Sequence, residues 1–270
     1  MRPVVVAILE RWFGGVADWL VPTYPVMLAL ACLLGAVGLV AAARRAGYPR
    51  RDTLGVVMIA YAAGLLGAHL VPLGQGLWAL VTTGHFRMRS GMAAYGGLFG
   101  GTLASIAWLW RRGLPIAPFL DAAAPSIGIG YFFSRLGCFL AGCDYGVPTR
   151  VPWAVRFPAG SHAFVDHAQR GLVDADAAWS LPVHPTQLYM AFVGLALSMV
   201  CAARPARGDG RRFALYVVGY AALRSLVELL RGDEGRGSLG PLSTSQVLAL
   251  VSVALVGALL VRQRRAALAT

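Results

Sequence analysis

Seven apolar runs, each about long enough to cross a lipid bilayer, set the main constraint on how this chain folds. A spanning helix needs about 20 predominantly apolar residues. The runs of that character are Tyr24–Ala43, Thr53–Leu73, Ala93–Trp110, Ala117–Ala141, Val183–Ala203, Phe213–Leu230 and Thr244–Val261. Only 13% of the residues are charged, against roughly a quarter in a soluble domain. We therefore predict an all-α, polytopic membrane protein with about seven transmembrane helices.

Arginines between the runs predict the orientation of these helices, because short cytoplasmic loops collect basic residues. They follow the first, third, fifth and seventh runs, and include Arg44, Arg111, Arg204 and Arg262. The amino terminus is therefore expected outside and the carboxyl terminus inside. The expected parts of the chain are an interfacial arm (1–23), spans one to four (24–141), a small extracytoplasmic head (142–182), spans five to seven (183–262) and a cytoplasmic tail (263–270).

The formal net charge of +12 raises the question of nucleic-acid binding, which needs a basic patch on a water-facing surface. The arginines instead punctuate apolar runs, so we expect a lipid bilayer as partner and no nucleic acid. The sequence has no zinc-ligand spacing and no nucleotide-binding glycine loop. We expect neither a metal nor a cofactor.

Two arginines within apolar runs are the main candidate functional residues, because a cation inside a membrane span is costly and marks a site unless a partner explains it. At helical rise, Arg135 lies about 27 Å and Arg224 about 16 Å from the cytoplasmic ends of their spans. Both are thus expected at or beyond the middle of the bilayer, toward its outer side. A guanidinium group suits phosphate, since its planar fork donates two hydrogen bonds and keeps its charge.

The two arginines differ in their expected partners. Tyr220, Arg224 and Glu228 share one helix face, so Glu228 either neutralises Arg224 or holds its guanidinium group toward an anion. Arg135 has no acid within one helical turn. Its partner must come from another span, the outer loop or a ligand, and we favour an anionic lipid headgroup. This interpretation fails if both arginines point into separate compartments, or are locked onto protein carboxylates with no cavity between them.

Other short segments predict local structure as well as function. Gly96 and Gly97 belong to a run of small residues at four-residue spacing, which is typical of close helix packing in lipid and would let a headgroup approach the backbone beside Tyr95. His184 either caps the helix that follows it or donates a hydrogen bond to a substrate. The segment from Ser243 resembles an ordinary helix start.

Two groups of side chains raise the question of metal binding. Cys138 and Cys143 are five residues apart, near opposite faces if their helix continues. A disulfide or a metal pair is possible only if that helix ends between them. In the head, His162, Asp166 and His167 are expected to be solvated surface residues rather than a metal site.

Four segments, in order, resemble the motifs of the prolipoprotein diacylglyceryl transferase family: Ser90–Leu98, Ser134–Phe139, His184–Tyr189 and Tyr220–Arg231. The resemblance implies a phosphatidylglycerol-dependent diacylglyceryl transferase, a multi-pass enzyme of the bacterial cytoplasmic (inner) membrane. Such an enzyme moves the diacylglyceryl group of phosphatidylglycerol to the lipobox cysteine of a prolipoprotein. A thioether forms and glycerol phosphate is released.

The same resemblance implies roles for individual residues. Arg135 and Arg224 match the family's essential arginines, which engage the phosphate and stabilise the leaving group. Tyr24 and Tyr220 match its functional tyrosines, Tyr24 as a substrate contact and Tyr220 as a catalytic residue. Further substrate contacts are expected from Gly96, Gly97, Cys138, His184, Gln187 and Glu228.

Departures from the family pattern concern the acceptor side. Tyr95, which we include among the candidate catalytic residues, stands where the family has a histidine that is a candidate base for the acceptor thiol. A tyrosine with a pKa near 10 is a poor base. His69 or His184 is a candidate replacement, and Cys138 replaces an asparagine. The alternative function is a non-catalytic or acceptor-altered membrane paralogue that binds lipid or lipoprotein.

Overall fold

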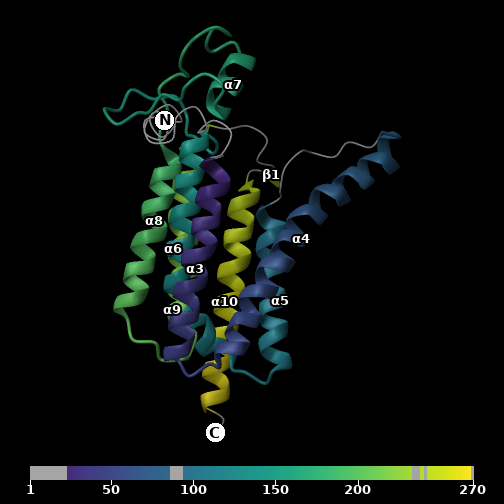
Figure 1. The fold of residues 1–270 in the computed structure, drawn as a ribbon, viewed down its shortest axis with the longest axis vertical. Helices are drawn as coiled ribbons and strands as arrows, with labels where there is room; N and C mark the ends of the chain where they lie inside the picture. The colour runs from purple at the N-terminus through teal and green to yellow at the C-terminus, as the bar shows by residue number, and fades with distance from the viewer. Residues whose placement is uncertain (1–22, 86–93, 233–237, 240–241, 269–270) are drawn as a thin grey trace, which may run out of the picture. The chain divides into compact units, whose positions relative to one another are not determined.

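The structure is a computed structural model, which describes residues 23–85, 94–232, 238–239 and 242–268. Helices dominate it (Figure 1). They are α3 (Thr23–Arg45), α4 (Arg50–Thr83), α5 (Ala94–Arg111), α6 (Ile116–Ala141), α7 (His162–Gln169), α8 (Thr186–Ala203), α9 (Arg211–Glu228) and α10 (Thr244–Leu268). Two short strands, β1 (Ser238–Leu239) and β2 (Leu242–Ser243), pair antiparallel. The all-α prediction is confirmed for the described residues apart from this hairpin; the expected interfacial arm lies outside them, except that Thr23 begins α3.

The long helices coincide with the predicted apolar runs. Within the described part of the chain, four segments are long and apolar enough to cross a membrane: Tyr24–Arg45, Arg50–Leu70, Ile116–Ala141 and Thr186–Ala203. Helix α9 carries four charged side chains within eighteen residues and is less suited to lipid. The structure therefore supports a membrane protein with several apolar helices, while the count of seven spans and their orientation remain predictions.

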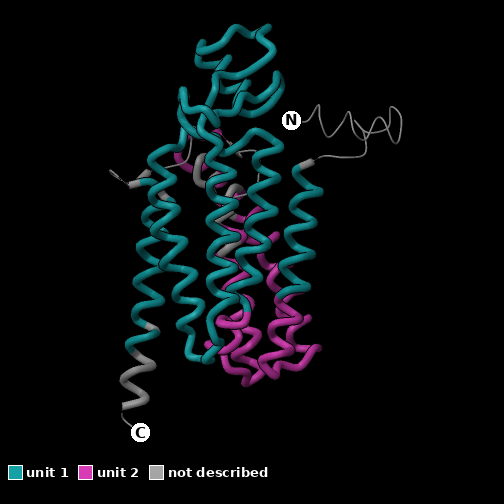
Figure 2. Tube along the Cα trace, turned by 90° about the vertical axis from the view of Figure 1, so that its left-hand side faces the viewer, with its two compact units in different colours: residues 1–38, 123–270 teal, residues 39–122 magenta. Residues whose placement is uncertain are grey.

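The chain divides into two compact units, residues 39–122 and residues 1–38 with 123–270 (Figure 2). In the first of these, α5 packs against α4 through glycines. A Cβ added to Gly97 would lie 3.2 Å from the Gly64 carbonyl oxygen, and one added to Gly101 would lie 2.9 Å from that of Ala60. The predicted role of the glycine run in close helix packing is thus confirmed. The buried core of this unit consists of Ala43, Tyr48, Val56, Leu109 and Phe119.

In the other unit, small residues bring α6 close to α3 and α8. A Cβ added to Gly130 would lie 3.2 Å from the Ala31 carbonyl oxygen on α3, and one added to Gly128 would lie 2.7 Å from the Ser198 Cβ on α8. The Ser198 hydroxyl also donates to the Pro125 carbonyl at 2.6 Å, which ties α8 to the proline turn inside α6. These approaches fix α6, the helix that carries Arg135.

Helix α10 begins with a reciprocal cap. The Ser243 N–H donates to Gln246 Oε1 at 2.9 Å, and the Gln246 N–H donates to Ser243 Oγ at 3.2 Å. Both donors would otherwise lack a partner in the first turn, so this capping box stabilises the helix start. The helix start predicted at Ser243 is confirmed.

The segment from residue 142 to 182 folds around α7 with isolated antiparallel bridges rather than a sheet. The Ser161 side chain caps α7 by accepting from the Phe164 N–H at 3.2 Å. The buried core of this segment consists of Tyr145, Phe157, Ala163 and Val183. The predicted small head therefore has an apolar centre of its own.

One prediction for the head is wrong. His167 was expected to be solvated, but only 1% of it is exposed, and its Nδ1 accepts from the Leu181 N–H at 3.3 Å. Burial lowers the pKa of this imidazole. The neighbouring Asp166 accepts from the Tyr145 hydroxyl and pairs with Arg170 at 2.8 Å. These side chains therefore hold α7 to the rest of the head.

Candidate active site

One carboxylate joins two arginines from different elements. Asp144 follows α6 by three residues; its Oδ2 lies 2.5 Å from Nη1 of Arg135, and its Oδ1 lies 2.8 Å from Nη2 of Arg231 at the end of α9. Arg231 is nearly inaccessible, with 7% of its side chain exposed. Burial raises the pKa of the Asp144 carboxyl, but the charges of Arg135 and Arg231 outweigh it and lower the pKa to about 2. The carboxylate is therefore ionised at neutral pH.

The backbone around Asp144 is held in an unusual conformation by the start of α8. Asp144 has a φ of 58°, in the left-handed region that a non-glycine residue seldom adopts. Its carbonyl accepts from Thr186 Oγ1 at 2.6 Å, and the Cys143 carbonyl accepts from Gln187 Nε2 at 2.6 Å. The Tyr145 carbonyl accepts from the Gly232 N–H at 3.1 Å. Contacts from two sides thus offset the strain at Asp144 and position its side chain.

Arg224 has a carboxylate partner on its own helix. Its Nη1 pairs with Glu228 one turn later, and its Nη2 donates to Ser245 Oγ on α10 at 3.1 Å. Only 12% of the Arg224 side chain and 5% of the Glu228 side chain are exposed. Contact between Arg224 and Glu228, expected from their spacing, is confirmed.

Two tyrosines connect the two arginines. The Arg135 guanidinium carbon lies 4.9 Å from the ring centre of Tyr131 on the preceding turn. The Tyr220 hydroxyl donates to the Tyr131 hydroxyl at 3.1 Å, with the rings edge to face. Tyr220 precedes Arg224 by one turn on α9. The two guanidinium groups therefore belong to one region and do not point into separate compartments.

Both arginines nevertheless bind a protein carboxylate, which bears on their expected role. Asp144 of the outer loop, one of the three expected sources, is a partner of Arg135 in this structure, while a lipid headgroup as partner stays a prediction. The phosphate interpretation fails if both arginines are locked onto protein carboxylates with no cavity between them. The ion pairs fulfil the first part of that condition. A phosphate role therefore requires a ligand to exchange with a carboxylate. Arg135 retains one unused group, since its buried Nε–H has no hydrogen-bond partner among the described residues.

His184 and Gln187 take part in contacts within the protein. His184 does not cap α8, since Pro185 occupies the N-cap position without a side-chain hydrogen bond. Its Nδ1 lies 3.1 Å from the Tyr189 hydroxyl, which also accepts from Trp153 Nε1 at 2.7 Å. Gln187 is buried, and its Oε1 has no hydrogen-bond partner among the described residues. The capping alternative for His184 is wrong, and the substrate alternative remains a prediction.

Tyr24 on α3 and Cys138 on α6 both lie near the end of α6 that leads into the loop. A Cβ added to Gly137 would lie 3.3 Å from Tyr24 Cδ2 and 3.0 Å from Met27 Cβ, so α3 and α6 approach closely at this glycine. Cys138 is buried, with its Sγ 3.9 Å from Nη1 of Arg135. The structure therefore brings Tyr24, Cys138 and Arg135 to the same end of α6.

The remaining expected site residues belong to the unit of residues 39–122. Gly96 and Gly97 pack against α4, where Gly67 and Gly64 face them. Tyr95 is the second residue of the same helix, and its side chain lies outside the described structure. On α4, the exposed His69 places Nδ1 2.8 Å from the Leu65 carbonyl oxygen. Roles for these residues toward a substrate remain predictions.

The arginines described above and their partners form one group, which we call the arginine cluster: Arg135, Arg224, Arg231, Asp144, Glu228, Tyr131 and Tyr220. The sequence interpretation missed three of these residues. Neither Asp144 nor Tyr131 was assigned a role, and Arg231 appeared only at the end of a family motif. Asp144 is the first acidic residue after Arg135 on the outer side of its span. Since a buried arginine needs a counter-charge, that position was the available signal.

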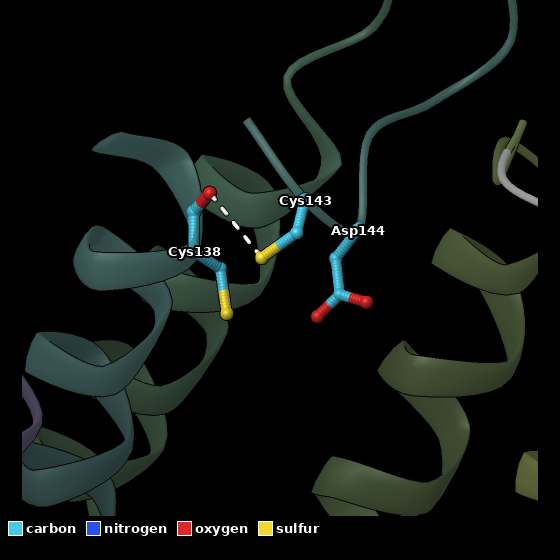
Figure 3. Close-up of side chains that lie close together, drawn as sticks. All are labelled: Cys138, Cys143 and Asp144. Carbon is cyan, nitrogen blue, oxygen red and sulfur yellow. Dashed lines mark hydrogen bonds between the residues drawn. The ribbon is translucent and has the colours of Figure 1, made fainter. Parts of the chain in front are cut away.

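The end of α6 also gathers three side chains that could ligate a metal (Figure 3). One ligand atom each from Cys138, Cys143 and Asp144 lies within 4.8 Å of the others. Both thiols are free in this structure. Asp144, however, already neutralises two guanidinium groups, whose charges oppose a cation at the same place. The charges of these two arginines therefore disfavour a metal ion at this place.

The fold and the site together define a class: a helical membrane protein whose buried arginines and carboxylates meet where a small head joins the helices. A model of the family described as prolipoprotein diacylglyceryl transferase matches residues 15–262. The chain therefore belongs to the prolipoprotein diacylglyceryl transferase family. The predicted class of enzyme, a transferase, is confirmed with the family.

Individual relatives agree with this assignment. A protein of Clostridium tetani named phosphatidylglycerol--prolipoprotein diacylglyceryl transferase is 30% identical over 234 residues, which cover 85% of this chain and 88% of the relative. A protein of Corynebacterium glutamicum with the same name is 30% identical over 235 residues, 80% of this chain and 72% of the relative. One of Sinorhizobium medicae is 34% identical over 187 residues, 66% and 60% of the two chains.

Proposed function

We propose that the protein transfers the diacylglyceryl group of phosphatidylglycerol to the sulfur of a lipobox cysteine in a prolipoprotein. The acceptor thiolate attacks the glyceryl carbon, a carbon–sulfur bond forms, and the carbon–oxygen bond to phosphate breaks. The phosphate oxygen keeps the electron pair, so glycerol phosphate leaves. The names of the relatives and the arginines of the site support this proposal.

The observation that carries the proposal is the Nε–H of Arg135. A buried donor without a partner costs about 1–3 kcal/mol, and this one lies on a side chain that already handles one anion. A phosphate oxygen on that N–H would remove the cost. Arg135 would then stabilise the charge that develops on the leaving phosphate, an interaction that is strongest in a water-poor site.

Arg224 would act with Arg135 on the same phosphate. The Tyr220 and Tyr131 hydroxyls lie along the path between the two guanidinium groups and can donate to the anion or hold its position. Glu228 holds Nη1 of Arg224 through an ion pair. Nη2 of Arg224 donates a hydrogen bond to a weaker partner, the hydroxyl of Ser245. A neutral serine is displaced from an arginine more readily than a carboxylate.

The acceptor thiol needs a base, and Tyr95 is poorly suited to that task. His69 and His184 are the proposed alternatives. The carbonyl of Leu65 fixes the proton of a neutral His69 on Nδ1, which leaves the basic lone pair on Nε2. His184 shares its Nδ1 with Tyr189, so a tyrosine could relay its proton.

The setting follows from the same proposal. We place the protein in the bacterial cytoplasmic (inner) membrane as a multi-pass protein, with the amino terminus and the segment 142–182 outside. Phosphatidylglycerol would then enter from the outer leaflet, where the secreted acceptor also arrives. The relatives carry transferase names, so the non-catalytic alternative is not favoured.

The test is mass spectrometry of products from purified full-length protein, isotope-labelled phosphatidylglycerol and a lipobox peptide. The expected result is a peptide heavier by one labelled diacylglyceryl group, together with free glycerol phosphate. A peptide with serine in place of the lipobox cysteine serves as control and should stay unmodified. Absence of both products with the wild-type protein would overturn the proposal.

A further inference from the structure

The way α6 ends brings two cysteines together. Gly142 takes the left-handed conformation (φ 72°), its N–H donates to the Phe139 carbonyl at 3.2 Å, and the Cys143 N–H donates to the Cys138 carbonyl at 3.1 Å. This pattern is a Schellman motif, which places the side chain two residues past the helix end against the one five positions earlier. Here those side chains are Cys143 and Cys138. The condition set by the sequence, that the helix ends between the two cysteines, is fulfilled.

The two thiols are in position to react with each other. Cys143 Sγ donates to the Cys138 carbonyl at 3.6 Å, and the two sulfurs lie within 4.8 Å of each other (Figure 3). A disulfide requires a sulfur–sulfur distance of about 2.05 Å, so rotation of the side chains has to close the remaining gap. The backbone stays in place, because Gln187 holds the Cys143 carbonyl and Thr186 holds that of Asp144.

We propose that Cys138 and Cys143 are a redox modification site, which a disulfide-type or azo-type thiol oxidant converts to an intramolecular disulfide. The two thiols lose two protons and two electrons, and a sulfur–sulfur bond forms. A disulfide oxidant is thereby reduced to two thiols, and an azo oxidant to a hydrazine. The predicted extracytoplasmic position of this loop exposes it to an oxidising compartment, where disulfides persist.

The bond would control the arginine cluster, a consequence that rests on the proposed function. Cys138 Sγ lies 3.9 Å from Nη1 of Arg135, and Asp144 directly follows Cys143. A disulfide would fasten the residue before Asp144 to the helix of Arg135. Asp144 would then keep its ion pair and exclude an incoming phosphate. Oxidised protein should therefore lose activity, and reduction should restore it.

The chain offers a direct readout, because trypsin cleaves after Arg135 and Arg150 and leaves both cysteines on one peptide. Full-length protein in detergent is treated with diamide or dithiothreitol, alkylated and digested. After diamide, the peptide 136–150 should be lighter by two hydrogen atoms and carry no alkyl label. Transferase activity should fall on the order of tenfold to a hundredfold, as small misplacements of a reacting group do, and recover with dithiothreitol.

Cys143→Ser should stay active under diamide and take one alkyl group on this peptide, while the matched variant Cys32→Ser should respond like the wild type.

Full alkylation of both thiols in the wild-type protein after diamide would overturn the proposed modification site, and this measurement does not depend on the folding of any variant. Protection by zinc chloride that a chelator reverses, without loss of hydrogen, would overturn it in favour of a metal. If the disulfide forms and the activity is unchanged, the inference that the disulfide keeps Asp144 paired with Arg135 and lowers activity is wrong. A disulfide in a protein that is inactive even when reduced would leave the site standing and refute the proposed function.

Discussion

Arg135 and Arg224 both bind carboxylates, but the two ion pairs differ in how they respond to change. Glu228 lies on the same helix as Arg224, so their contact needs only one helical turn. Asp144 reaches Arg135 through a loop held by α8 and α9. The Arg135 pair therefore depends on the surrounding fold, whereas the Arg224 pair is local.

Replacement of either arginine should abolish turnover without unfolding the protein. For Arg135→Ala and Arg224→Ala we expect losses on the order of 10²–10³ in the rate, as for removal of a donor that stabilises a developing anion. Lysine should also impair both positions, because a point charge does not reproduce the guanidinium fork. Arg211→Lys, at an exposed pair with Asp209, is the control. Normal rates with labelled phosphatidylglycerol in both alanine variants would refute the assigned roles.

Asp144→Asn should change how stability depends on pH. The folded-state pKa of about 2 lies below the ordinary 3.8, so the ionised carboxylate stabilises the fold fully above about pH 4 and progressively less as pH falls toward 2. The wild type should therefore unfold at a higher temperature than Asp144→Asn at pH 6, and this difference should shrink toward pH 2. A difference that stays constant over that range would contradict the ion pairs.

The sequence indicated the two arginines directly, whereas for the partner of Arg135 it offered only the position of Asp144 as the next acidic residue. A cation inside an apolar run is visible in a single sequence. The contact with Asp144 depends on a left-handed residue after a helix end and on bonds from Thr186 and Gln187, more than forty positions away. Such long-range contacts leave no local pattern.

At the scale of helices, close approach of α6 and α8 is the feature most open to test. A Cβ added to Gly128 would meet the backbone of Gly194 and lie 2.7 Å from Ser198 Cβ. Gly128→Ala should therefore destabilise the protein by about 1–3 kcal/mol, the usual cost of overpacking. Gly257→Ala, where a Cβ meets nothing within 4 Å, should leave stability unchanged or raise it. Thermal unfolding in detergent measures both, and equal melting temperatures would contradict the packing.

Apolar runs predicted the helices to within a few residues, with α4 as the main exception because it continues to Thr83. The interior of the head was not predictable in the same way. Its isolated bridges pair distant residues, such as Pro148 with Val183, and short irregular segments carry no periodic signal. The burial of His167 is one result of these pairings.

At the scale of the whole molecule, the placement of arginines predicts an orientation that reporter fusions can test. Alkaline phosphatase needs disulfides and is active only outside the cytoplasm. A fusion after Gly171, in the head, should be active, and one after Gly208, between α8 and α9, should be inactive. The reverse pattern would invert the predicted topology and remove the outer-leaflet donor from the proposal.

The double ion pair of Asp144 sets a threshold for entry of any competing anion. A ligand that takes Arg135 must displace one of the two charge-assisted hydrogen bonds of Asp144, and such a bond is worth about 1.5–3 kcal/mol. Asp144 stays in the site after such an exchange with its second partner, Arg231, so a bound phosphodiester adds one negative charge to the site. Small inorganic anions, which bring no acyl chains to add binding free energy, would be turned away. Under the proposed function, the resident carboxylate would therefore set the affinity that a lipid donor has to exceed.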